Sequence, residues 1–159
     1  MALELWLPAW LHRALLPLAH ILRRYWRHWR KAPIAGVSVI LTNPAGEVLL
    51  LRHSYGAPVW GLAGGGMSPR EDPQAAARRE VREELGLELG ALEQVAVIEE
   101  VLSGSPHTAH LYAAVVDQPP RPDRREILEA RFFAPDALPQ NLGRTTRARL
   151  AAWQARRAG

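Results

Sequence analysis

The sequence predicts an α/β fold, a layered sandwich in which helices cover a mixed β-sheet. Short runs rich in Val, Ile and Leu are bounded by turn residues, which is typical of strands. Segments with helix start and stop signals lie between and after these runs. The chain has 159 residues, of which 48% are hydrophobic and 23% charged, enough for one domain with a proper core. Strands flanked by helices in this way favour a layered α/β architecture.

The first 33 residues are predicted to form a basic, amphipathic helical arm ahead of a domain at 34–159. Large apolar side chains recur at three- and four-residue steps, namely Leu7, Leu11, Leu15, Leu18, Ile21, Leu22, Tyr25 and Trp29. Pro17 predicts a kink or a restart of the helix. Six basic and one acidic residue give residues 1–33 a net charge of +5, so the other 126 residues carry −1 of the total of +4. The basicity therefore belongs to the arm.

Three roles are open for this arm. It packs on its own domain or on a second subunit of a homodimer, as most amphipathic helices bury their apolar face against protein. Alternatively, it lies on an anionic membrane as a peripheral contact, with tryptophans near the headgroups, or it binds nucleic acid, which is the least expected of the three. The tryptophans concerned are Trp6, Trp10, Trp26 and Trp29.

The composition also bears on the compartment. Charged residues and prolines interrupt the apolar residues 3–22, so we expect neither a secretory signal nor a spanning helix. The chain has no cysteine, which excludes disulfides and thiolate metal sites and fits a reducing cytoplasm. We expect a cytoplasmic protein, with the inner membrane surface as the place of any peripheral contact.

The domain is predicted to begin with two strands, Ile34–Thr42 and Glu47–Arg52, joined by a turn at Asn43–Gly46. A loop at His53–Val59 follows and leads into the glycine run Gly64–Gly66, which we expect to remain a loop.

The next element is a helix with clear ends. Asp72 is the expected N-cap and Pro73 the first helical residue, because a start at Ser68 would place the proline where it clashes with the preceding turn. Gly86 suits the position just past the helix. The predicted buried stripe consists of Ala77, Val81 and Leu85.

The rest of the chain supplies two long strands, a further short strand and a last helix. The long strands are predicted at Leu92–Leu102 and Thr108–Asp117. A proline-rich loop, Gln118–Arg125, precedes the short strand near Ala130–Phe133. A basic helix at about Arg144–Arg157 ends the chain.

Three carboxylates converge on one face of the first domain helix. Glu80, Glu83 and Glu84 are spaced i, i+3 and i+4, so they share a face within one turn. Like charges this close repel one another, and a hard divalent cation such as Mg²⁺, with Mn²⁺ as a substitute, relieves that repulsion. The alternative is a solvated surface helix whose glutamates pair with Arg78, Arg79 and Arg82.

The surrounding spacing is more specific than the charges. It consists of Gly65, five residues, Glu71, seven residues, Arg79-Glu80-Val81, one residue, Glu83-Glu84, one residue and Gly86-Leu87. This resembles the signature box of the Nudix hydrolases at every fixed position over 23 residues, and the wider similarity covers roughly residues 35–138. The resemblance implies an α/β/α sandwich with a mixed sheet, and hydrolysis of nucleoside diphosphates linked to another moiety.

The resemblance also implies roles for the residues of the box. Glu83 and Glu84 are the expected metal ligands, and Glu80 is either a third ligand or the general base. Arg79 is expected to orient a glutamate, with Glu71 as its partner. The backbone carbonyl of Gly64 is a further candidate ligand. Ala63 departs from the proline that relatives often have there.

Residues outside the box are weaker candidates. Glu126 is the preferred downstream acidic metal ligand, with Glu129 next and Glu99 or Glu100 after it. Glycines let backbone approach phosphate closely, and an aromatic ring can stack on a base. The candidate substrate-binding residues are Gly65, Gly66, Arg52, Tyr55 and Trp60. The alternatives are that the glycines merely make a turn and that the aromatic rings take a core or rim position, which is the commoner case.

The resulting hypothesis is a Mg²⁺-dependent pyrophosphohydrolase acting on a small nucleoside-diphosphate derivative, with ADP-ribose or a nucleotide sugar as the first guess. The enzyme alternative acts on nucleoside triphosphates or RNA 5′ ends. The non-enzyme alternative is a catalytically silent module that binds nucleotide or uses the arm for membrane contact or assembly.

Overall fold

The computed structural model describes residues 34–102 and 104–159. The predicted arm at 1–33 lies outside the described residues. None of the helices in the described part is both long and apolar enough to cross a membrane.

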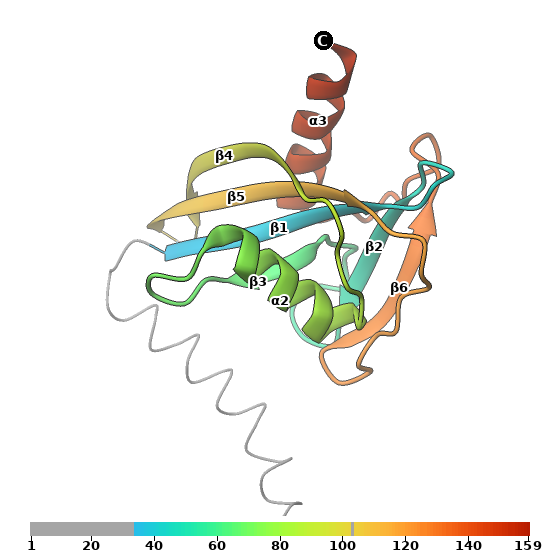
Figure 1. Ribbon diagram of the computed structural model, residues 1–159, viewed down its shortest axis with the longest axis horizontal. Coiled ribbons are helices and arrows are strands. Elements are labelled where there is room, and N and C mark those ends of the chain that lie inside the picture. The colour runs from blue at the N-terminus through green and yellow to red at the C-terminus, as the bar shows by residue number, and fades with distance from the viewer. Residues whose placement is uncertain (1–33, 103) are drawn as a thin grey trace, which may run out of the picture.

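The described strands form one six-stranded mixed sheet (Figure 1). Its order is β4-β5-β1-β2-β6, and β3 pairs with β1 outside this path. β1 and β5 run parallel, while the other pairs are antiparallel. The strands are β1 (Ile34–Thr42), β2 (Val48–His53), β3 (Ala63–Gly66), β4 (Glu93–Leu102), β5 (Ser105–Val115) and β6 (Ile127–Phe133). The predicted mixed sheet is confirmed.

Two helices cover opposite faces of this sheet (Figure 1): α2 (Pro73–Leu85) and α3 (Arg144–Ala158). β1 alternates between the two sides, as strand geometry requires. Val39 belongs to the core under α2 and Ile40 to the core under α3, and neither is exposed. Burial on both faces explains why this strand is a continuous apolar run. The helices and sheet make the predicted α/β/α sandwich.

The two core clusters divide along these faces. Ala77, Val81 and Leu85 of α2 are fully buried in the first, so the predicted stripe is confirmed. Leu150 and Trp153 of α3 pack in the second. Phe132 packs against the first cluster and Phe133 against the second.

The prediction of a loop at Gly64–Gly66 was wrong, since these residues belong to strand β3. Gly65 pairs with Val37 and Gly66 with Gly36 of β1. Gly64 has φ of +144°, and a Cβ atom there would lie 2.1 Å from the carbonyl oxygen of Val37. Only glycine allows this close approach of two backbones. Glycine runs are usually turns, and for that reason the pairing of β3 with β1 was not predicted.

Candidate active site

Helix α2 begins and ends where the sequence predicts. The Asp72 carboxylate accepts a hydrogen bond from the Ala75 amide (2.9 Å), and Pro73 is the first helical residue. Gly86 is left-handed, with φ of +63°, and its amide donates to the carbonyl of Arg82. The caps fix the two ends of the helix, and the packing of its apolar stripe fixes its rotation about its axis. With its apolar stripe in the core, the glutamate face lies along the edge of that core.

Glu84 is the most deeply placed of the three glutamates, at 7% exposure. Its Oε2 accepts a hydrogen bond from the Gly64 amide at 2.9 Å. Burial raises the pKa of Glu84 to about 8; the Gly64 bond lowers it, and the carboxylates of Glu80, Glu126 and Asp123 raise it further. Within the described residues, the ion pairs of the box involve Glu71, Glu80 and Glu83, and none involves Glu84. A buried carboxyl group without a cation favours its protonated form.

Arg79 holds the other acidic groups of the box in place. Its guanidinium forms a fork with Glu71, with Nε–Oε1 at 2.8 Å and Nη2–Oε2 at 3.0 Å. Nη1 donates to Glu80 at 2.7 Å and lies 3.5 Å from Glu83, and Nη2 donates to the carbonyl of Gly66. The predicted pairing with Glu71 is confirmed. A planar five-donor group is suited to such a network, and lysine is not.

Glu71 is the anchor of that network. Besides Arg79, it accepts a hydrogen bond from the Ser68 amide at 2.8 Å, which folds the loop back onto the helix. The Arg79 hydrogen bonds, followed by the Ser68 bond, lower the pKa of Glu71 to about 2. The pKa of Arg79 is raised, chiefly by its hydrogen bonds to Glu71. Glu71 therefore stays charged throughout the physiological range.

Glu80 lies between Arg79 and strand β3. Burial raises its pKa, against the lowering effect of the hydrogen bond and charge of Arg79. A Cβ atom at Gly65 would lie 2.7 Å from the Cδ and both oxygens of this carboxylate. Gly65 thus leaves the space that the Glu80 carboxylate occupies. The carbonyl of Gly66 accepts a hydrogen bond from Arg79, and the amide of Gly64 donates one to Glu84. No contact of the Gly64 carbonyl tests its predicted role as a metal ligand, which stays a prediction.

The loop before β6 brings two more carboxylates toward Glu84. Glu126 and Asp123 both raise the pKa of Glu84, and both raise that of His53, whose pKa burial lowers. The sequence singled out Glu126, and its role as a ligand stays a prediction. Asp123 was missed. Its Oδ1 accepts from the amides of Arg125, Glu126 and Ile127 at 2.9 to 3.0 Å, a turn pattern that an aspartate shortly before a strand can indicate.

The weaker acidic candidates have partners of their own in the sheet. Glu129 forms an ion pair with Arg52 at 2.9 Å. Glu100 forms one with Arg149 at 2.8 Å and also meets His107. Glu99 accepts a hydrogen bond from the hydroxyl of Thr108. These three glutamates therefore have structural contacts, within the sheet or between the sheet and α3.

The three side chains proposed for substrate differ in exposure. Trp60 is 7% exposed and packs edge-on against Phe133, so it is a core residue with little ring surface for a base. Arg52 pairs with Glu129 and lies 5.4 Å from the Trp60 ring centre. Tyr55 is half exposed, and its ring lies 5.1 Å from that of His53. Of the two aromatic rings, that of Tyr55 is the more exposed.

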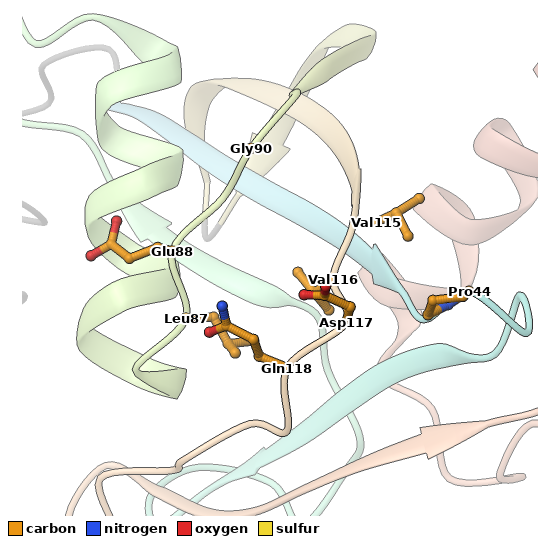
Figure 2. A pocket seen from close by; sticks show the side chains of 8 residues that line it. All are labelled: Pro44, Leu87, Glu88, Gly90, Val115, Val116, Asp117 and Gln118. Atoms are coloured by element: carbon orange, nitrogen blue, oxygen red, sulfur yellow. The ribbon is translucent and has the colours of Figure 1, made fainter.

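Within residues 34–102 and 104–159, no three His, Asp or Glu side chains are gathered closely enough to form a ready-made metal cluster. Arg79 occupies one side of Glu80, and Glu83 extends into solvent with 59% of its side chain exposed. A hollow of about 390 Å³ is found elsewhere, at the end of α2 (Figure 2). Leu87, Val116 and Gln118 are among its lining residues, and none of the box glutamates contributes to it.

Comparison with known proteins adds the decisive observation. The profile of the NUDIX domain matches residues 32–154. The chain belongs to the Nudix family. This Nudix domain is 35% identical over 106 residues to an uncharacterised Nudix hydrolase of Pseudomonas aeruginosa, covering 64% of this chain and 63% of the relative. An RNA pyrophosphohydrolase of Pseudomonas savastanoi pv. phaseolicola is 46% identical over 52 residues, a third of this chain and 32% of the relative. The chain thus matches less than two thirds of the length of these curated relatives.

Solved structures share the fold of this Nudix domain. A MutT NUDIX hydrolase from Burkholderia pseudomallei has a TM-score of 0.69 and 29% identity, covering 76% of this chain and 98% of that one. The NUDIX domain of Shewanella oneidensis NrtR, solved with ADP ribose, has a TM-score of 0.66 over 87% of this chain and 97% of that one. At 17% identity, the second likeness concerns the fold alone.

Proposed function

We propose that this Nudix domain is a Mg²⁺-dependent hydrolase of the pyrophosphate bond in a nucleoside diphosphate linked to another moiety. The observation that carries the proposal is the buried carboxyl of Glu84. It lies near Glu80 and the downstream carboxylates, and it forms no ion pair with a basic side chain of the described residues. A buried carboxylate in its charged form lowers the stability of the fold. We therefore infer that Glu84 serves a function and not the stability of the fold.

The donor set fits a divalent cation. Glu80, Glu83 and Glu84 offer carboxylate oxygens, the ligands preferred by Mg²⁺ and Mn²⁺. We assign Glu83 and Glu84 as ligands. Glu80 either completes the set or accepts a proton from the attacking water. When bound, the metal would offset the charge of the phosphates and lower the pKa of a bound water.

The remaining residues position this set. Arg79 keeps the carboxylate of Glu80 aligned through its Nη1 hydrogen bond, and Glu71 keeps Arg79 aligned through the two-point fork. The glycine strand β3 brings backbone against Glu80 and Glu84. Tyr55, whose side chain is half exposed, is the proposed stacking partner for a base.

The substrate is proposed from the similarities. ADP-ribose or a nucleotide sugar is the first candidate, which follows from the activity that the Nudix box implies. The second candidate is an RNA 5′ end or a nucleoside triphosphate, which the 46% identity with an RNA pyrophosphohydrolase favours. Homodimer formation and membrane contact through residues 1–33 remain separate proposals.

The test is phosphate and nucleotide release from a panel of ADP-ribose, nucleotide sugars, triphosphates and 5′-triphosphorylated RNA with Mg²⁺. Glu83→Gln should reduce turnover of the accepted substrate at least about 100-fold, because a lost metal contact is worth several kcal/mol. Glu88→Gln is the matched control, since Glu88 is also exposed (68% of its side chain, against 59% for Glu83) and pairs with Arg82. Unchanged turnover in Glu83→Gln would refute the site, and no turnover of any substrate by the wild type would favour a binding module.

Metal binding is expected to depend on pH. Because the pKa of Glu84 is about 8, the metal-free domain carries a proton there at pH 7, and a ligand carboxylate must lose it. We expect release of about one proton per bound Mg²⁺ or Mn²⁺ at pH 7, and affinity that rises with pH toward 8. Calorimetry in two buffers of different ionisation enthalpy measures this release. Glu84→Gln should abolish it, and buffer-independent heats in the wild type would contradict the assignment.

A further inference from the structure

One side of the edge strand β4 has no covering layer in the described residues. Val97 pairs with His110 of β5, and His110 pairs in turn with Val37 of β1, which lies in the core under α2. Side chains in such a row share a face of the sheet. Val97, Glu99 and Val101 therefore lie on the α2 side. Helix α2 packs mainly on β3 and β1, and Figure 1 shows it away from β4.

The exposure of these side chains follows from that arrangement. Val97 is 48% and Val101 74% exposed, and Glu99 between them is also exposed. On the other side of β4, Val95 packs in the core under α3, and Arg156 of α3 donates to its carbonyl. We call the uncovered side the β4 face; it consists of Val97, Glu99 and Val101 with Thr108 and His110. Exposed valines on a long edge strand are a feature that proteins usually cover.

The residues that precede β1 start close to this surface. Ile34 pairs with His107 of β5, and His107 pairs with Glu100 of β4. Two strand spacings, about 10 Å, therefore separate the end of the arm from β4. A helix of 31 residues would be about 45 Å long, against about 34 Å for a ten-residue strand. The arm therefore starts close enough to β4 to reach it, and a helix of this length could cover the whole strand.

The charge and the apolar side chains of residues 1–33 also complement the β4 face. Residues 1–33 carry a net charge of +5 and an apolar stripe at helical spacing. Glu99 is the acidic residue of the β4 face and β4 contains no basic residue, while Glu93 and Glu100 pair with Arg156 and Arg149 of α3. A helix with leucines on one side and arginines beside them can cover the valines while its cations lie near Glu99. We propose that the apolar stripe of residues 1–31 docks on the β4 face of its own chain, completing the layer that α2 begins.

The absence of cysteine allows a clean test in the full chain. A single thiol is introduced as Val101→Cys or, for the matched control, as Val115→Cys, a 65% exposed position on β5 that lies outside the β4 face. Labelling by a thiol reagent is timed in each protein and divided by its own rate in denaturant. Val101→Cys should react at least tenfold more slowly than Val115→Cys. Adding Leu18→Asp should bring the two rates together, with unchanged circular dichroism showing that the domain stays folded.

Other outcomes would overturn the proposal. Equal rates in the two single-cysteine proteins would show that nothing covers Val101. Protection that weakens on dilution would assign the covering segment to a second copy of the chain. Protection that appears only with anionic phosphatidylglycerol vesicles, or only with an RNA oligonucleotide, would assign the arm to a membrane or to nucleic acid.

Discussion

Glu84→Gln is expected to lose at least about 100-fold in turnover while the metal-free protein becomes more stable at pH 8. Glutamine keeps the shape of the side chain and the oxygen that accepts the Gly64 amide, so the local packing is preserved. It cannot supply an anionic ligand, which removes an interaction worth several kcal/mol in the reaction. Activity and stability therefore change in opposite directions.

The sign of the stability change follows from the pKa of this group. It is about 8 in the folded chain, against an ordinary value of 4.5, so between these values the folded state holds a proton that the unfolded state has lost. Wild-type stability should then fall as pH rises from about 4.5 to 8. The variant lacks this loss. Its advantage should be absent near pH 4.5 and reach the order of a few kcal/mol at pH 8.

Thermal unfolding in EDTA at pH 5 and pH 8, together with kcat in Mg²⁺, measures both effects. Glu88→Gln again serves as the control, since Glu88 is exposed on the surface beside Arg82. A variant that is inactive because it is unfolded would show a lower melting temperature at both pH values. Equal pH dependence of stability in wild type and Glu84→Gln would contradict the burial argument.

Alanine at Gly64 and at Gly65 is expected to act on different properties. At Gly64 the new Cβ would lie 2.1 Å from the backbone oxygen of Val37, with φ of +144°. Backbone cannot retreat without breaking the β1–β3 pairing, so we expect a loss of more than about 3 kcal/mol and a melting temperature lower by roughly 10 °C or more.

At Gly65 the nearest obstacle is the movable carboxylate of Glu80, at 2.7 Å. Gly65→Ala should therefore fold, but with Glu80 displaced from Arg79. A displacement of about 1 Å at a reacting group costs about 100-fold in rate, so we expect a loss of that order in kcat. Gly90→Ala, where a Cβ meets nothing within 4 Å, is the control for both. Normal turnover in Gly65→Ala would show that the placement of Glu80 is unimportant.

Much of the helix at the site could be predicted because its signals are local. Asp72, Pro73 and Gly86 act on the backbone within one turn of themselves, and the spacing of Glu80, Glu83 and Glu84 sets their common face whatever the helix packs on. The Arg79–Glu71 pair was also predictable, through the motif that the two residues share with a known family.

Pairings between distant segments could not be read in this way. Gly64–Gly66 has a turn-like composition, but its conformation is set by β1, which lies almost thirty residues earlier. Arg52 and Trp60 suggested a substrate surface, but Arg52 pairs with Glu129, 77 positions later, and Trp60 packs on Phe133, 73 positions later. The residues around a position in the sequence do not indicate which distant residues it will contact in the fold.

The order of predicted strands and helices was enough to predict the type of fold. The limits of the acidic helix and the carboxylates that share one of its faces were also predictable, because capping and helical period depend on neighbouring residues. Tertiary structure decided how far each carboxylate is buried and what it meets: Glu84 against the Gly64 amide, Glu80 against Gly65, and Asp123 and Glu126 near Glu84. The pKa of a carboxyl group depends on solvent exclusion and on charges brought near it through space, and both arise only when the sheet and the helix pack together.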